Sequence, residues 1–122
     1  MGLDMYLTKR DGTQLGYWRK ANQIRQWFVD HAGYPETGNC IDFQISDYTL
    51  EELYNTCREV LAHPEKAEEL LPSSSGFFFG GTEYNEWYFE QVKETADMID
   101  NIFLNDLVDW DKDGSVIYSE WW

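Results

Sequence analysis

Residues 82–103 read TEYNEWYFEQVKETADMIDNIF, and this stretch predicts the longest helix of the chain. Its apolar side chains recur every three or four residues, which is the spacing that lines up one face of an α-helix. Thr82, followed directly by Glu83, is a suitable residue to begin the helix. The face that we expect to point into the core consists of Tyr88, Val92, Ala96, Ile99 and Phe103.

Acidic residues follow the opposite side of this predicted helix. An acidic stripe, made of Glu83, Glu86, Glu90, Glu94 and Asp97, falls within an arc of roughly 80° at about 100° per residue. The stripe covers about 21 Å of helix, or one charge every 4–5 Å or so. One strand of B-DNA carries a phosphate about every 3.4 Å. The stripe therefore suggests nucleic-acid mimicry, and a solvated outer helix face is the alternative interpretation.

The rest of the chain alternates between short strand-like and helix-like patterns. Alternating apolar residues predict strands, and apolar residues at helical spacing predict helices. We expect strands at residues 3–8, 41–45, 77–79 and 116–122, and helices at 17–28, 49–61 and 65–71 besides the one at 82–103. Residues 109–114 are expected to form a turn. This order predicts an α+β fold in which a small, mostly antiparallel sheet of about four short strands packs against about three helices.

The composition indicates one folded domain over residues 1–122. Of the residues, 43% are hydrophobic and 17% aromatic, which is too apolar for a disordered acidic chain. The formal net charge is −14, and the acidic excess lies almost wholly after residue 32. Residues 1–32 carry five basic and three acidic side chains, and residues 33–122 carry four basic and twenty acidic ones. Such a surface repels nucleic acid and membranes and attracts basic partners.

Two further patterns bear on the location of the protein. No run approaches the roughly 20 apolar residues of a membrane span, and the first residues lack the basic and apolar segments of a signal peptide. Cys40 and Cys57 are isolated from one another, so we expect both thiols to be buried and reduced. These patterns predict a cytoplasmic protein.

Three motifs resemble a family of small proteins that phages, prophages and gut Firmicutes encode. They are Gly2-Leu3-Asp4-Met5-Tyr6-Leu7, then Tyr17-Trp18-Arg19-Lys20-Ala21-Asn22, and then Ser75-Gly76-Phe77-Phe78-Phe79-Gly80 with Thr82, Tyr84 and Glu86-Trp87-Tyr88. The resemblance covers nearly the whole chain. It implies a mobile-element origin and an action inside the host bacterium, and it implies no particular activity.

The sharpest match to a chemical motif is near the C-terminus. Asp109-Trp110-Asp111-Lys112-Asp113-Gly114, with Glu120 six residues further on, fits the twelve-residue calcium loop of an EF-hand. The candidate ligands are Asp109, Asp111, Asp113 and Glu120. However, residues 116–118 are strand-like, and only two residues follow Glu120. We therefore expect a turn without a metal, with calcium binding as the alternative.

The predicted first helix offers another candidate site. Lys20, Trp27 and His31 line one edge of its apolar face, and Trp18 and Arg25 line the other edge. An indole next to a cation can hold a flat ligand such as a nucleotide. The alternative interpretation is that both tryptophans pack at the edge of the core.

Other combinations carry weaker signals. The glycine-flanked residues 75–81 precede a helix, as an anion-binding loop does, but no lysine follows them, so we expect turn glycines. Cys40, Cys57, His31 and His63 lack the spacing of zinc ligands. We therefore predict that the protein binds rather than catalyses and needs no cofactor. Its expected role is to inhibit a host defence system, as an anti-CRISPR protein does, by occupying a basic, nucleic-acid-binding host protein.

Overall fold

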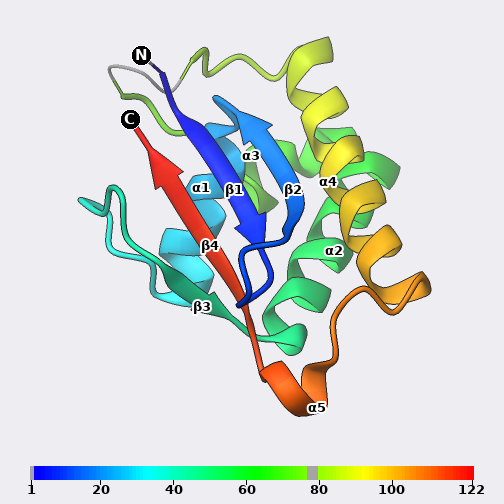
Figure 1. Ribbon diagram of the computed structural model, residues 1–122. Helices are drawn as coiled ribbons and strands as arrows, with labels where there is room; N and C mark the ends of the chain where they lie inside the picture. The colour runs from blue at the N-terminus through cyan, green and yellow to red at the C-terminus, as the bar shows by residue number, and fades with distance from the viewer. Residues whose placement is uncertain (1, 77–79) are drawn as a thin grey trace.

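The computed structural model describes residues 2–76 and 80–122, and it contains a four-stranded antiparallel sheet with helices packed on one face (Figure 1). The strand order across the sheet is β2-β1-β4-β3. The strands are β1 (Asp4–Thr8), β2 (Gln14–Arg19), β3 (Phe43–Ile45) and β4 (Val116–Trp121). The predicted α+β class is therefore confirmed.

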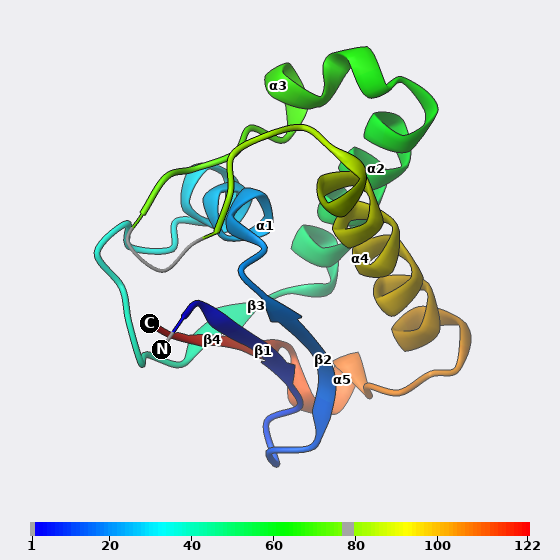
Figure 2. The same ribbon diagram turned by 90° about the horizontal axis from the view of Figure 1, so that it is seen from above.

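The helices fill the connections between these strands. They are α1 (Asn22–Trp27), extended by a π-helical turn (Phe28–Ala32), α2 (Asp47–Ala62), a 3₁₀ turn (Pro64–Lys66), α3 (Ala67–Leu70), α4 (Glu86–Leu104) and α5 (Trp110–Asp113). Figure 2 shows α1, α2 and α4 on the same side of the sheet, and no helix of residues 2–76 and 80–122 covers its other face. The fold is thus a two-layer sandwich.

Alternation along β1 and β4 builds the sheet side of the core. Met5 and Leu7 on β1 and Val116 and Tyr118 on β4 are fully buried, whereas their neighbours along each strand are less buried. The helices complete the core with Ile24, Phe28, Leu50, Leu53, Cys57, Val60, Tyr88, Val92, Ala96, Ile99 and Ile102. The predicted core face of the long helix is confirmed at Tyr88, Val92, Ala96 and Ile99, and Phe103 is only partly buried.

The prediction of a helix from residue 17 was wrong at its beginning. Residues 14–19 form β2, which pairs with β1 so that Tyr17 lies opposite Tyr6 and Trp18 opposite Met5. The Trp18 Nε1 donates a hydrogen bond to Thr95 Oγ1 at 2.8 Å, which ties β2 to α4. Aromatic residues fit a pleated, half-buried surface, and this tertiary packing overrides the helical spacing. Lys20 then takes a positive φ of 57°, and α1 begins at Asn22.

Other boundaries shift by a few residues. The side chain of Ser46 caps α2, and that of Asn85, not Thr82, caps α4, because each accepts a hydrogen bond from the backbone N–H three residues on. The predicted turn at 109–114 contains the single-turn helix α5. The predicted strand at 41–45 is limited to 43–45, and the one at 77–79 lies outside the described residues.

Candidate functional site

The acidic stripe lies on the outer face of α4. Glu86, Glu90, Glu94 and Asp97 are exposed, and buried residues occupy the opposite side of the helix. Glu83 is also exposed, but it precedes the helix, so its predicted place on the helical stripe was wrong. The four helical carboxylates span about 16 Å, at about 5 to 6 Å per charge. Lys93 lies among them and pairs with Asp97 at 2.9 Å.

The negative charge of the whole molecule is concentrated in the segment that carries α2 to α5, which we call the acidic helical layer. Residues 47–113, which carry α2 to α5, contain seventeen acidic and four basic side chains and so a net charge of −13. The remainder of the chain, which carries the sheet and α1, contains six acidic and five basic side chains and a net charge of −1. The protein therefore presents a strongly acidic helical layer of α2 to α5 beside a nearly neutral part made of the sheet and α1.

The predicted site on the first helix does not form. Trp18 lies on β2, and both it and Trp27 are only 3% exposed. Arg25 is buried in an ion pair with Glu120, and the Trp27 ring stacks on His31 with centroids 5.0 Å apart. Of the five predicted residues, only Lys20 lines the cavity at the start of α4 that is described below. The predicted set was Trp18, Lys20, Arg25, Trp27 and His31. The interpretation of these residues as one ligand platform was wrong, because most of them belong to the core.

A buried polar network, which the sequence did not reveal, surrounds Glu120. Arg25 Nε donates to Glu120 Oε2 at 2.7 Å, Tyr118 Oη donates to Oε1 at 2.6 Å, and Trp122 Nε1 donates to Oε2 at 2.7 Å. Arg25 also donates to the backbone oxygens of Glu36 and Gly38. Burial and the nearby Glu120 carboxylate raise the pKa of Tyr118 well above its ordinary value. The phenol therefore stays protonated and keeps donating at neutral pH.

This network also bears on the alternative prediction that the loop at residues 109–120 binds calcium. Glu120, the proposed bidentate ligand, faces the core and is held by Arg25. Asp109 accepts a hydrogen bond from the backbone N–H of Lys112 and thereby caps α5. The alternative site at Asp109, Asp111, Asp113 and Glu120 is therefore wrong in its geometry. Over residues 2–76 and 80–122, no three His, Cys, Asp or Glu side chains come together in a way that could hold a metal ion.

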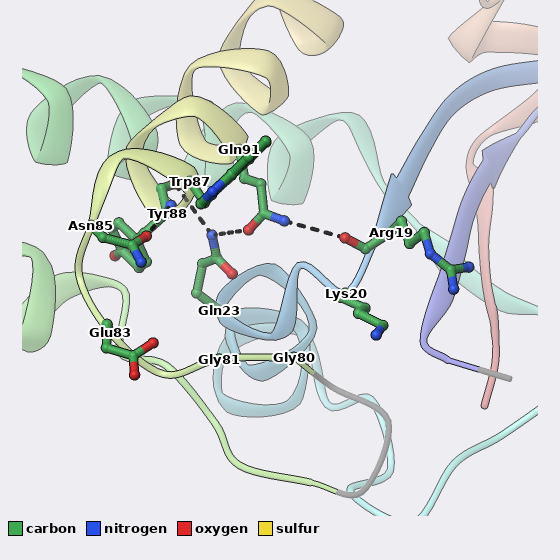
Figure 3. A pocket seen from close by; sticks show the side chains of 10 residues that line it. All are labelled: Arg19, Lys20, Gln23, Gly80, Gly81, Glu83, Asn85, Trp87, Tyr88 and Gln91. Carbon is green, nitrogen blue, oxygen red and sulfur yellow. Dashed lines mark hydrogen bonds between the residues drawn. The ribbon is translucent and has the colours of Figure 1, made fainter.

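A cavity of about 500 Å³ lies where β2 passes into α1 and where α4 begins. Figure 3 shows Lys20 and the exposed Trp87 at its edges, with Glu83 on the side away from Lys20. Gln23 lies in its wall, where its Nε2 donates to Gln91 Oε1 at 3.0 Å and to the Tyr88 carbonyl at 3.4 Å. Gln91 in turn donates to the Arg19 carbonyl at 3.2 Å. The amides of Gln23 and Gln91 thus join β2, α1 and α4 around the cavity.

The two cysteines differ in their surroundings. Cys57 is buried as predicted, but Cys40 is exposed, so the prediction of two buried thiols was wrong for Cys40. Both are free thiols. None of the helices in the described part of the chain is long and apolar enough to cross a membrane.

Compared with known proteins, the chain matches no family model, and it matches neither a curated protein nor a solved structure. Its function therefore has to be inferred from its own residues.

Proposed function

We propose that the protein acts by binding a basic partner protein through its acidic helical layer, in the place that nucleic acid would occupy. The observation that carries the proposal is the charge distribution, with a net −13 on residues 47–113 and −1 on the rest of the chain. The exposed carboxylates Glu86, Glu90, Glu94 and Asp97 form a regular row on α4 within this layer. Rows of exposed acidic groups steer a basic partner to one face of the protein.

The partner in this proposal is a nucleic-acid-binding protein of a bacterial host, and the effect of binding is inhibition. The resemblance of three sequence motifs to proteins of phages and prophages supports a defence effector as the target, as for an anti-CRISPR protein. The exposed row of carboxylates on α4 supports a competitor of a phosphate backbone, because both present a line of negative charges. The spacing is about 5 to 6 Å on α4 and about 3.4 Å along one DNA strand.

The experiment is a competition. The protein is immobilised, host proteins are bound to it, and a short DNA duplex is added at low and at high salt. We expect DNA to release a basic protein from the acidic layer, and added salt to weaken its binding, since exposed charges are screened over about 10 Å at 0.1 M salt. A partner that stays bound in the presence of DNA and is insensitive to salt would contradict mimicry.

A second candidate function, binding of a small ligand such as a nucleotide, is favoured by the cavity at Lys20 and Trp87 (Figure 3). The indole of Trp87 offers a surface for stacking a base, and the ammonium of Lys20 can pair with an anion. The test is a thermal shift with mononucleotides at low salt. Trp87→Ala should remove the shift, and Trp121→Ala, which removes an exposed indole from β4, should leave it unchanged. No shift for the parent protein would reject this function.

A further inference from the structure

A groove of about 330 Å³ lies between α2 and α4, in the middle of the acidic helical layer. We call it the α2–α4 groove, and its lining consists of Glu51, Tyr54, Asn55, Asp100 and Phe103. Two carboxyl groups and two aromatic rings therefore face the same small space, with one of each on either helix.

Contacts of the lining residues fix the two aromatic walls of the groove. Tyr54 Oη on α2 donates a hydrogen bond to Asp100 Oδ2 on α4 at 3.2 Å, which joins the two helices. The Phe103 ring is stacked on Trp110 of α5, with ring centroids 5.7 Å apart and an interplanar angle of 23°. The groove is thus held by partners on three helices, which lowers the entropy cost of binding a ligand there.

The charges around the groove select a cation. Glu51 and Asp100 line it, so an anion would be repelled, whereas Asp97, one helical turn from Asp100, is paired with Lys93. The basic group nearest along α2 is Arg58, which is exposed and lies one turn beyond Tyr54. Burial and the hydrogen bond to Asp100 raise the pKa of Tyr54, so its hydroxyl remains a neutral donor to that carboxylate.

The surroundings of the groove also offer apolar contact. Leu104, one turn beyond Asp100 on α4, is 78% exposed. A ligand that fits has a flat cationic end for the carboxylates and rings and an apolar stem for the edge of the groove. A guanidinium forms paired hydrogen bonds with a carboxylate and stacks on aromatic faces, whereas an ammonium is a strongly hydrated point charge.

We propose that the α2–α4 groove receives an arginine side chain of the basic partner, with the guanidinium between Glu51 and Asp100 and against the rings of Tyr54 and Phe103. This inference rests on the proposed function and adds to it a position and a side chain. It makes the groove the centre of the interface and the stripe on α4 its charged surroundings, as in interfaces where a few enclosed residues dominate the affinity.

The test compares two probes of equal charge, a nona-arginine and a nona-lysine peptide, on the folded protein. The key variant is Asp100→Asn, which removes one charge and keeps an oxygen that can accept from Tyr54. Its matched control is Glu94→Gln, which removes one charge from the exposed stripe on the same helix. We expect the parent to prefer the arginine peptide by about fivefold or more, Asp100→Asn to lose most of that preference, and Glu94→Gln to keep it.

Equal effects of Asp100→Asn and Glu94→Gln on both peptides would overturn the arginine groove while leaving the proposed function standing. Conversely, a partner protein that binds a variant with Glu86, Glu90 and Glu94 all changed to Gln as tightly as the parent would contradict the proposed function, whatever the peptides do. If Asp100→Asn does not fold, the parent is titrated with methylguanidinium and with methylammonium by NMR. Shifts of the Tyr54 and Phe103 ring signals with methylguanidinium alone support the groove, and their absence overturns it.

Discussion

Arg25 and Glu120 form a buried ion pair, with Nε and Oε2 2.7 Å apart, although 95 residues separate them in the chain. Their side chains are 2% and 0% exposed. The pair joins α1 to β4. Tyr118 and Trp122 also donate to Glu120, and the backbone oxygens of Glu36 and Gly38 accept from Arg25. The Arg25 guanidinium also lies 5.6 Å from the ring centroids of Tyr34 and Trp122.

Removing one partner of this pair should be strongly destabilising. Glu120→Leu leaves the Arg25 guanidinium buried without its counter-charge, and such a change costs about 3–5 kcal/mol. The measurement is the free energy of unfolding from urea titration. The control is the double variant Arg25→Met with Glu120→Leu, which removes both charges and should recover much of the loss. Equal destabilisation by the single and double variants would show that packing, rather than the unpaired charge, sets the cost.

Asp4 accepts hydrogen bonds from Tyr17 and Arg19 on the open face of the sheet, and these contacts predict that the stability of the fold depends on pH. The hydrogen bond from Tyr17, and with it the contact with Arg19, lowers the pKa of Asp4 below its ordinary 3.8. Since the folded-state pKa is lowered, the stabilisation is present above pH 3.8 and is lost as the pH falls through the folded value. Asp4→Asn should therefore be less stable than the parent near neutral pH and equally stable in strong acid. A stability difference that persists in acid would contradict this assignment.

The sequence was sufficient to predict α2 and α4, because amphipathic spacing is a local signal. The exposed stripe on α4 and the core positions Tyr88, Val92, Ala96 and Ile99 follow from such spacing. The strand at residues 14–19 was missed because Tyr17 and Trp18 also fit the helical period that continues through Ile24 and Phe28. Only the pairing with β1 and the hydrogen bond from Trp18 to Thr95 distinguish the two.

The candidate sites were less predictable because they depend on contacts between distant residues. The calcium motif at residues 109–120 has suitable side chains, but the burial of Glu120 against Arg25 cannot be inferred from the spacing. The α2–α4 groove likewise joins Tyr54 to Asp100, 46 residues apart. A single sequence carries no signal for such a pairing, apart from the matching positions of acidic and aromatic residues on two amphipathic helices.

The aspartates near the C-terminus should differ in their effect on stability. Asp109 caps α5, so Asp109→Ala should cost about 1 kcal/mol. The double change Asp111→Asn with Asp113→Asn should alter the melting temperature little, with or without Ca²⁺, because neither carboxylate forms a hydrogen bond or an ion pair within the described part of the chain. Thermal unfolding with Ca²⁺ and with EDTA checks both. A calcium-dependent rise that the double change abolishes would restore the metal site.

The two thiols should react at very different rates. Burial raises the pKa of Cys57 to about 12, so its thiolate is scarce at mildly alkaline pH and the sulfur is also shielded from reagents. Cys40 is exposed. We expect an aromatic disulfide reagent to modify one thiol in the folded protein and both in denaturant. Cys40→Ser should abolish the fast reaction, and rapid modification of that variant would show that Cys57 becomes accessible through local opening of α2.

The acidic stripe should contribute to binding and not to folding. Glu86, Glu90 and Glu94 follow one another at intervals of four residues, where like charges cost a few tenths of a kcal/mol per pair. Glu86 also lies in the first turn of α4, where a negative charge is favourable, so the two effects on stability oppose each other. Changing all three to Gln should therefore leave the fold intact and its free energy of unfolding within about 0.5 kcal/mol of the parent.

The same triple variant should bind the basic partner more weakly, and the difference should shrink as salt is added, because salt screens the charges of the parent. The measurement is partner affinity for the parent and the triple variant at two salt concentrations. The control is a triple change of Glu65, Glu68 and Glu69 to Gln. It removes the same charge from the 3₁₀ turn and α3, which follow the C-terminus of α2. Equal losses from both triple variants would mean that total charge alone drives association. No loss from the α4 variant at either salt concentration would remove the stripe from the interface and leave it as a solvated helix face.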